Sequence, residues 1–164
     1  MAGVNSSTLI TQITEKITLN GNKYDNVVEK RITGISDIFK RIVTCPASVD
    51  TTVFRSSVSV DVTDSSLDVQ DVKYIRVTNL DDTNSVNLNL QIDVTESDSG
   101  ASAANETATI LLEAGRSFIM GTSHDSVAAY TTDASVQTTL HDLESILIDP
   151  SSNAVDMEIL VASS

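Results

Sequence analysis

The chain has 164 residues, of which 40% are hydrophobic, 4% are aromatic and none is tryptophan. This length suits one domain with its own core, and the hydrophobic content excludes a chain that is disordered by composition. The 23 acidic residues against 10 basic ones give a formal net charge of -13, which argues against a nucleic-acid-binding surface because phosphate neutralisation needs clustered Lys and Arg. We expect a soluble domain with a core of Val, Ile and Leu.

Neither a targeting segment nor a membrane span is expected. Residues 1–5 contain no basic side chain and no apolar run, so they do not resemble a signal peptide. No apolar run approaches the roughly 20 residues of a membrane helix. Cys45 is the one cysteine, which excludes an intrachain disulfide. Because it ends an apolar segment, we predict a buried, unreactive thiol and not a nucleophile.

In chain order, the first predicted elements are a flexible arm and a hairpin. Residues 1–8 are small and polar, which is typical of a flexible N-terminal arm, and residues 9–164 are expected to form a single β-sandwich domain. Apolar residues recur in 9–19, and a second β-rich run covers 23–33. Asn20 and Gly21 between these runs are the pair most typical of a two-residue hairpin turn.

Residues 35–45 fit two structures. The apolar positions 35, 38, 39 and 42 have the spacing of an amphipathic helix. Against this, Gly34 and Pro46 bound the segment and residues 41–44 are strand-like, which favours a strand with a bulge near residues 36–37. We favour the strand and keep the helix as the alternative. Residues 51–62 predict another strand pair, in which Val58, Val60 and Val62 alternate with polar residues.

The most regular stretch of the sequence is 72–94. In its second half the apolar residues Val86, Leu88, Leu90, Ile92 and Val94 alternate with Asn87, Asn89, Gln91 and Asp93. A period of two places one set on a buried face and the other on a solvated face. Residues 72–80 are rich in β-branched and aromatic side chains, and the polar cluster 81–84 favours a turn. We predict the central antiparallel hairpin of the sandwich here.

A loop and two further hairpins complete the prediction. Residues 95–106 are rich in Ser, Ala and acidic residues and are predicted to project as a loop. Segments 107–112 and 116–120 are expected to pair around Gly115, which suits a positive φ, and 140–148 to pair with 155–161. The eight to ten short strands predict the all-β class, as an antiparallel, jelly-roll-like β-sandwich.

Few residues are candidates for chemistry, and each has a plainer interpretation. His124 and His141 are each followed by Asp and are candidate metal ligands, but no third ligand stands at a metal-site spacing. Ser117 follows Gly115 and Arg116 but lacks the second glycine and the parallel sheet of a nucleophile elbow. We therefore predict no catalytic residue, no cofactor-binding residue, no metal ligand and no enzymatic activity.

Three acidic runs and two asparagines complete the candidates. Residues 61–64, 81–84 and 93–98 offer the oxygen atoms that Ca²⁺ prefers, but none has the spacing of a defined calcium loop, so solvated loops are expected. Whether the 95–106 loop binds a ligand stays open. Asn5 and Asn105 match the N-glycosylation pattern, which we interpret as coincidental because no signal peptide is expected.

The second half of the chain runs from VKYIRVTNLD (72–81) into VNLNLQI (86–92), then LLEAGRSF (111–118), and closes with VDMEILVAS (155–163). This order resembles that of small virion structural proteins of tailed bacteriophages, such as capsid decoration (cement) proteins and neck or tail components of marine phages. The resemblance covers most of residues 72–164.

The resemblance implies a homotrimeric decoration protein that is assembled in the host cytoplasm and stabilises the head of the virion. Its partner there is the major capsid protein or another virion protein, with no nucleic acid and no membrane. A neck, tail or fibre-associated structural protein is the alternative in the same class. The alternative of another class is a carbohydrate-binding β-sandwich module. Such modules usually present Trp or Tyr to sugar rings, whereas this chain has no Trp and three Tyr.

Overall fold

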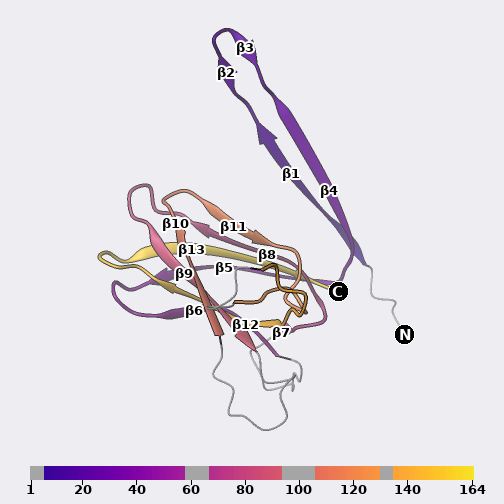
Figure 1. The fold of residues 1–164 in the computed structure, drawn as a ribbon, viewed down its shortest axis with the longest axis vertical. Coiled ribbons are helices and arrows are strands. Elements are labelled where there is room, and N and C mark those ends of the chain that lie inside the picture. Colours follow the sequence, from indigo (N-terminus) through magenta and orange to yellow (C-terminus); the bar gives the residue numbers. More distant parts are fainter. Residues whose placement is uncertain (1–5, 58–66, 94–105, 130–134) are drawn as a thin grey trace.

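The computed structural model describes residues 6–57, 67–93, 106–129 and 135–164. All regular elements among these residues are strands, and most of them form two sheets that pack face to face below a projecting hairpin (Figure 1). This arrangement confirms the predicted all-β class and the β-sandwich. No helix in the described part of the chain is long and apolar enough to cross a membrane.

The first four strands form the hairpin that projects from the sandwich. They are β1 (Ser7–Glu15), β2 (Thr18–Leu19), β3 (Asn22–Lys23) and β4 (Asn26–Ile35). β1 pairs with β4, and β2 with β3, in one antiparallel register that shifts only between Ser7 and Thr8. Asn20 and Gly21 have φ values of 50° and 80°, which are the positive values that a type I′ turn requires. The predicted Asn-Gly hairpin is therefore confirmed, and we call residues 7–35 the arm.

Because residues 7–35 form the arm, the sandwich begins later in the chain than we predicted. We predicted a flexible segment over residues 1–8 and a sandwich from residue 9 onwards. Residues 1–5 lie outside the described residues, Ser7 and Thr8 belong to β1, and the first strand of the sandwich starts at Asp37. The alternating pattern in 9–33 does form strands, but the sandwich covers only the apolar side chains at their base, Leu9 and Ile32.

The sandwich consists of a five-stranded and a four-stranded sheet. In spatial order the first contains β10 (Glu106–Leu112), β9 (Val86–Asp93), β12 (Asp142–Asp149), β6 (Thr51–Ser57) and β7 (Leu67–Asp68). The second contains β11 (Ser117–Met120), β8 (Val72–Asn79), β13 (Val155–Ser163) and β5 (Asp37–Cys45). All neighbours are antiparallel except β6 and β7. Within segment 35–45, residues 37–45 are thus a strand, and the helix alternative is wrong.

Three predicted hairpins are in fact connections between the two sheets. β8 and β9, which are the two halves of the 72–94 stretch, lie in different sheets, and so do β10 and β11, and β12 and β13. The hairpin predictions are wrong because a turn signal marks only where the chain reverses. It does not show whether the next strand pairs at about 4.8 Å or lies about 10 Å away across the core.

The core between the sheets is almost entirely aliphatic. The alternation predicted for β9 is confirmed, since Val86, Leu88, Leu90 and Ile92 are at most 5% exposed. Val86, Leu88 and Leu90 pack with fully buried residues of the facing sheet, among them Ile75, Val77, Met157 and Ile159. The strand predicted around residues 58–62 lies outside the described residues, and so does the loop predicted at 95–106 except for Glu106, which is the first residue of β10.

Candidate functional site

One face of the arm carries most of its apolar side chains. Residues that are paired across an antiparallel ladder point to the same face, and successive residues point to opposite faces. The register therefore puts the pairs Leu9–Ile32, Ile13–Val28 and Ile17–Tyr24 on one face. We call this face the apolar stripe, which consists of Leu9, Ile13, Ile17, Leu19, Tyr24, Val28 and Ile32. The opposite face holds mostly polar residues, such as Gln12, Thr14, Lys16, Asp25 and Glu29.

The apolar stripe is covered only at its base. There, Leu9 and Ile32 pack against a small cluster formed by Ile35, Tyr74 and Ala162. The other five members of the stripe are 52–61% exposed. A two-stranded hairpin by itself is at best marginally stable in water. The arm therefore presents a surface that gains stability when another surface covers it.

The free energy available from this surface is modest. Fully burying one such side chain is worth about 1.5–3 kcal/mol, and because each is already about half covered, about 1 kcal/mol remains for each. Five side chains then contribute roughly 5 kcal/mol, which is near the lower end of the roughly 4–15 kcal/mol that association costs in lost freedom. One arm alone is a weak attachment, so stable binding requires additional surface or several copies.

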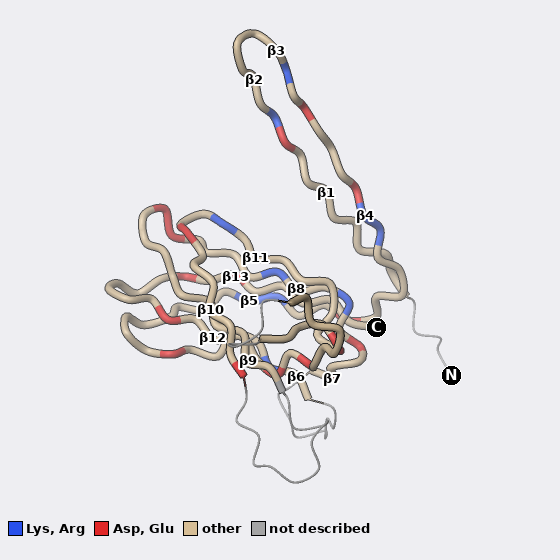
Figure 2. Tube along the Cα trace, in the orientation of Figure 1, with Lys and Arg blue, Asp and Glu red and all other residues tan. Residues whose placement is uncertain are grey.

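The arm also differs from the rest of the chain in charge. Residues 6–35 contain four of the 10 basic residues but only three of the 23 acidic ones (Figure 2). Several other acidic residues lie in the loops at the end of the sandwich opposite to the arm (Figure 2). Because like-charged bodies repel each other, the arm approaches another copy with less electrostatic cost than these acidic loops do.

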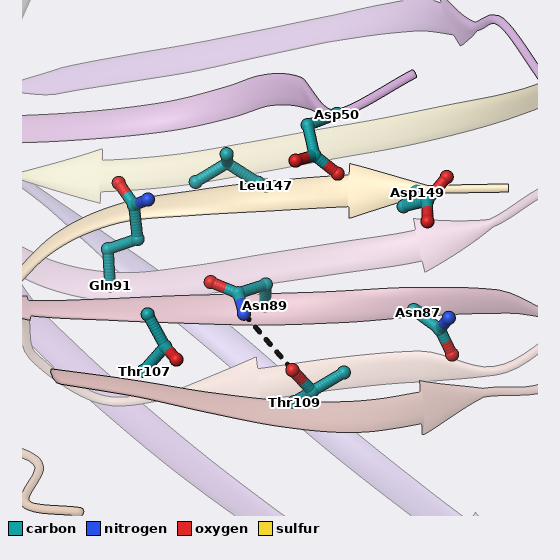
Figure 3. A pocket seen from close by; sticks show the side chains of 8 residues that line it. All are labelled: Asp50, Asn87, Asn89, Gln91, Thr107, Thr109, Leu147 and Asp149. Atoms are coloured by element: carbon teal, nitrogen blue, oxygen red, sulfur yellow. Dashed lines mark hydrogen bonds between the residues drawn. The ribbon is translucent and has the colours of Figure 1, made fainter. Parts of the chain in front are cut away.

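A polar groove of about 340 Å³ lies on the outer face of the five-stranded sheet (Figure 3). Its lining residues are Asp50, Asn87, Asn89, Gln91, Thr107, Thr109, Leu147 and Asp149. The alternation that buries Leu88 and Leu90 turns the amides of β9 outwards. Asn89 Nδ2 donates a hydrogen bond to Thr109 Oγ1 at 3.0 Å, and Gln91 Oε1 accepts one from Ser145 at 2.5 Å. The predicted polar face of β9 is therefore the floor of this groove.

Two carboxylates give the groove an excess of hydrogen-bond acceptors. Asp50 immediately precedes β6, and Asp149 is the last residue of β12 (Figure 3). Oδ1 of Asp149 is buried and has no hydrogen-bond partner among the described residues. No aromatic side chain is among the eight lining residues. The groove is thus suited to hydroxyl or amide donors and not to stacking against a ring.

Of the two candidate metal ligands, only His124 belongs to a group of metal-ligating side chains in the described part of the chain. Its Nδ1 lies 2.9 Å from Asp142 Oδ1, and its Nε2 lies 3.3 Å from Asp125 Oδ2. The backbone amide of Asp125 donates to the same Asp142 oxygen at 2.7 Å. His141 pairs through its backbone with Val127 and is not in this group. Both ring nitrogens of His124 already face carboxylates, so polar contacts within the chain account for this geometry.

Other sequence candidates have structural roles. Cys45 is buried, and this burial raises the pKa of its thiol, as expected for an unreactive cysteine. Ser117 lies in β11, where its Oγ is 2.8 Å from Thr78 Oγ1. Asp81 accepts a hydrogen bond from the backbone amide of Asn84, which lowers the pKa of the Asp81 carboxyl group. Asp81 therefore stabilises a turn. Outside the described residues lie Asn5, Asp61, Asp64, Glu96, Asp98 and Asn105.

Sequence reasoning missed an ion cluster on the outer face of the four-stranded sheet. Glu158 Oε2 lies 2.9 Å from Lys40 Nζ, and its other oxygen accepts a hydrogen bond from Arg76. The hydrogen bond from Lys40, together with the charges of Lys40 and Arg76, lowers the pKa of Glu158. Around this cluster Ile38, Ile42 and Ile119 are 48–60% exposed. The only sequence signal is the alternation of β5 and β13, which does not show that these strands are neighbours.

Comparison with family models, with curated proteins and with solved structures gives no match. The two surfaces that stand out are therefore interpreted from their own chemistry. The apolar stripe offers side chains that water solvates poorly, and the polar groove offers hydrogen-bond acceptors. Both suit the binding of a partner surface, and neither contains a nucleophile paired with a base.

Proposed function

We propose that the chain is a non-enzymatic structural protein of a tailed-bacteriophage virion, most specifically a capsid decoration protein that stabilises the head by binding the major capsid protein. The observation that carries the proposal is the projecting arm with its exposed apolar stripe. A protein that stabilises a shell by binding to it needs a rigid body and an attachment element, and it needs no reactive group. The arm and the sandwich meet these two requirements.

The strand order supports a jelly roll for the body. Without the two-residue β7, one sheet has the order β5-β13-β8-β11 and the other β6-β12-β9-β10. The chain changes sheet at each connection between these strands except the one from β9 to β10. Two four-stranded sheets with Greek-key connections form a jelly roll, an architecture found in viral capsid domains and in lectins. The fold therefore supports a virion protein without distinguishing it from a sugar-binding module.

The weak binding expected of one arm supports an oligomer, and we propose a homotrimer. Closed cyclic assemblies repeat one contact over every copy, and a symmetric shell offers the matching repeats. Several linked contacts bind far more tightly than one because later contacts form within the same complex. The same reasoning applies to the alternative position at the neck, tail or fibre.

The proposal is tested by locating the protein in particles of the phage that encodes it. We expect mass spectrometry to find the chain in purified virions, and immunogold label to cover the head surface. Purified chain added to expanded heads is expected to bind saturably and to raise their melting temperature. Label restricted to the neck or tail would favour the alternative virion position. Absence of the chain from purified particles would overturn the proposal.

The polar groove favours the carbohydrate-binding module as a second candidate. Its amide and carboxylate groups match the hydroxyl groups of a sugar, although it lacks an aromatic platform. A glycan array would distinguish the two functions. Binding of a defined glycan that is lost in the Asn89→Ala variant, with no binding to phage heads, would support the sugar-binding function.

A further inference from the structure

We propose that the apolar stripe of one copy docks on the outer face of the four-stranded sheet of a second copy, so that copies join by exchanging their arms. The inference rests on the proposed structural function and deepens it by naming the two surfaces through which copies associate. Both surfaces belong to the same chain and are present in equal number. Each is largely uncovered in the isolated molecule.

The first argument is continuity with a contact that the structure already contains. Leu9 and Ile32, at the base of the stripe, pack with Tyr74 and Ala162. Those two residues belong to β8 and β13, and Leu160 of β13 packs against the same cluster. The stripe and the outer sheet face therefore meet within one molecule. Beyond this contact the arm rises away from its own sheet (Figure 1), so both surfaces continue without a partner.

The second argument is that the sheet face, like the stripe, exposes large apolar side chains. Ile38 and Ile42 of β5 are 54% and 60% exposed, and Ile119 of β11 is 48% exposed. The pairing of β5 with β13, and of β11 with β8, puts these side chains on the face that carries Leu160 and Tyr74. This face thus presents exposed isoleucines on both of its edge strands to an incoming arm.

The third argument is the match in size. In an extended strand, residues 10–20 span about 36 Å at about 3.3 Å per residue. The nine residues of β13 span about 30 Å, so the free part of the arm has the length of the sheet. A hairpin face about 10 Å wide then buries roughly 350 Å² on each side, which is less than half of the roughly 800 Å² per partner of a standard interface. Reciprocal exchange doubles this area, which favours a closed assembly in which every copy both gives and receives an arm.

The fourth argument is charge complementarity. Lys40 and Arg76 share one carboxylate, Glu158, and so leave the centre of the sheet face with a net positive charge. Of the two charged residues on the side of the stripe, Lys30 lies nearer the base and Glu15 farther out. A docked arm therefore brings Glu15 to a face whose centre holds two cations and one carboxylate, whereas the second carboxylate of the face, Asp156, lies near one end of β13 and accepts a hydrogen bond from Thr44. The pairing compensates a charge that each copy alone leaves exposed.

The test measures the oligomeric state of the full chain by analytical ultracentrifugation at concentrations up to about 100 μM. Ile17→Lys places a charge on the stripe, and Ile42→Lys places one on the sheet face. Thr14→Lys is the matched control, because Thr14 lies in the same strand as the stripe but points to the opposite face. We expect the wild type and the control to form a closed oligomer and both other variants to be monomeric, with unchanged circular dichroism.

A mixing experiment separates arm–sheet exchange from arm–arm pairing. The Ile17→Lys chain keeps an intact sheet face and the Ile42→Lys chain keeps an intact arm, so an equimolar mixture restores one arm–sheet contact. We expect the mixture to associate about tenfold more tightly than either variant alone. An Ile42→Lys variant that stays oligomeric would overturn the inference, and so would a monomeric wild type. A monomer that still binds phage heads would overturn arm exchange alone, whereas an oligomer that is absent from particles would overturn only the proposed function.

Discussion

Ile17 and Tyr24 lie opposite each other near the tip of the arm, joined by a 2.8 Å hydrogen bond from the amide of Tyr24 to the carbonyl of Ile17. Their side chains are 60% and 59% exposed. Such a pair is typical of the covered face of a sheet. By itself, a cross-strand pair of an aromatic and a β-branched residue stabilises a hairpin by at most about 1 kcal/mol. In the isolated molecule the arm depends on its turn, its ladder of hydrogen bonds and its base.

The turn of the arm is expected to be sensitive to a change at Gly21. An added Cβ would meet no atom within 4 Å, but φ is +80°, so Gly21→Ala costs about 1 kcal/mol in backbone strain alone. We predict faster amide hydrogen exchange in residues 15–26 and an unchanged melting temperature of the sandwich. Gly121→Ala is the control, since Gly121 has open space and no positive φ. Equal exchange rates in the two variants would argue against a type I′ turn that stabilises the arm.

The stability of the sandwich is expected to depend on the buried face of β9 and not on the exposed face of its neighbour β10. Leu88 of β9 is fully buried, whereas Leu111 of β10 is 62% exposed. Leu88→Ala is predicted to lower the free energy of unfolding by about 2–5 kcal/mol because it leaves a cavity. Leu111→Ala is predicted to change it by less than about 0.5 kcal/mol. Urea denaturation measures both, and similar losses would contradict the assigned register.

The connection from β8 to β9 is expected to depend on Asn79, whose side chain is fully buried. Its Nδ2 donates to the carbonyl of Asn84 at 2.8 Å, and its Oδ1 accepts from the amide of Asp81 at 3.0 Å. Asn79→Leu keeps a similar volume but leaves these groups without partners, so we predict a loss of about 1–3 kcal/mol. Asn153→Leu is the control, because it removes only an exposed hydrogen bond, from Asn153 Nδ2 to Asn84 Oδ1 at 3.1 Å. A neutral Asn79→Leu variant would show that the turn does not need this residue.

The sequence predicted strands reliably but not the sheet to which each strand belongs. In β8 and β9, Ile75, Val77, Leu88 and Leu90 all point into the core, and they would do so equally in a hairpin or across a sandwich. The alternation shows that one face of each strand is buried, but it does not show which strand lies beside it in the sheet. Only Asn20 and Gly21, where two residues fix the turn geometry, gave a correct hairpin.

The candidate surfaces were only partly predictable for the same reason. The polar side of β9 follows directly from its alternation, and it does line a groove. The arm has an equally regular pattern, which predicts a buried face, yet Ile13 and Val28 are more than half exposed. A periodic pattern shows that a face is built to be covered, and it does not show whether the cover comes from the same chain.

Acid is expected to weaken the sandwich partly through Glu158. The hydrogen bond from Lys40, with the nearby charges of Lys40 and Arg76, lowers the pKa of Glu158 in the folded protein, whereas the unfolded value is about 4.3. Between these values the unfolded chain binds more protons, so stability rises with pH there. The contribution of Glu158 is thus fully present above about pH 4.3 and is lost as the pH falls through the lowered folded value.

The variant Glu158→Gln tests this contribution. The Glu158 side chain is 16% exposed but that of Lys40 is 54% exposed, so solvent screening limits the expected loss to about 0.5–1 kcal/mol near neutral pH. We predict that the difference between variant and wild type shrinks as the pH falls below about 4, when measured by urea denaturation at low ionic strength. Glu29→Gln, which removes an exposed pair with Arg31 in the arm, is expected to leave the stability of the sandwich unchanged at each pH. A loss for Glu158→Gln that stays constant down to about pH 3 would show that packing, and not charge, is responsible.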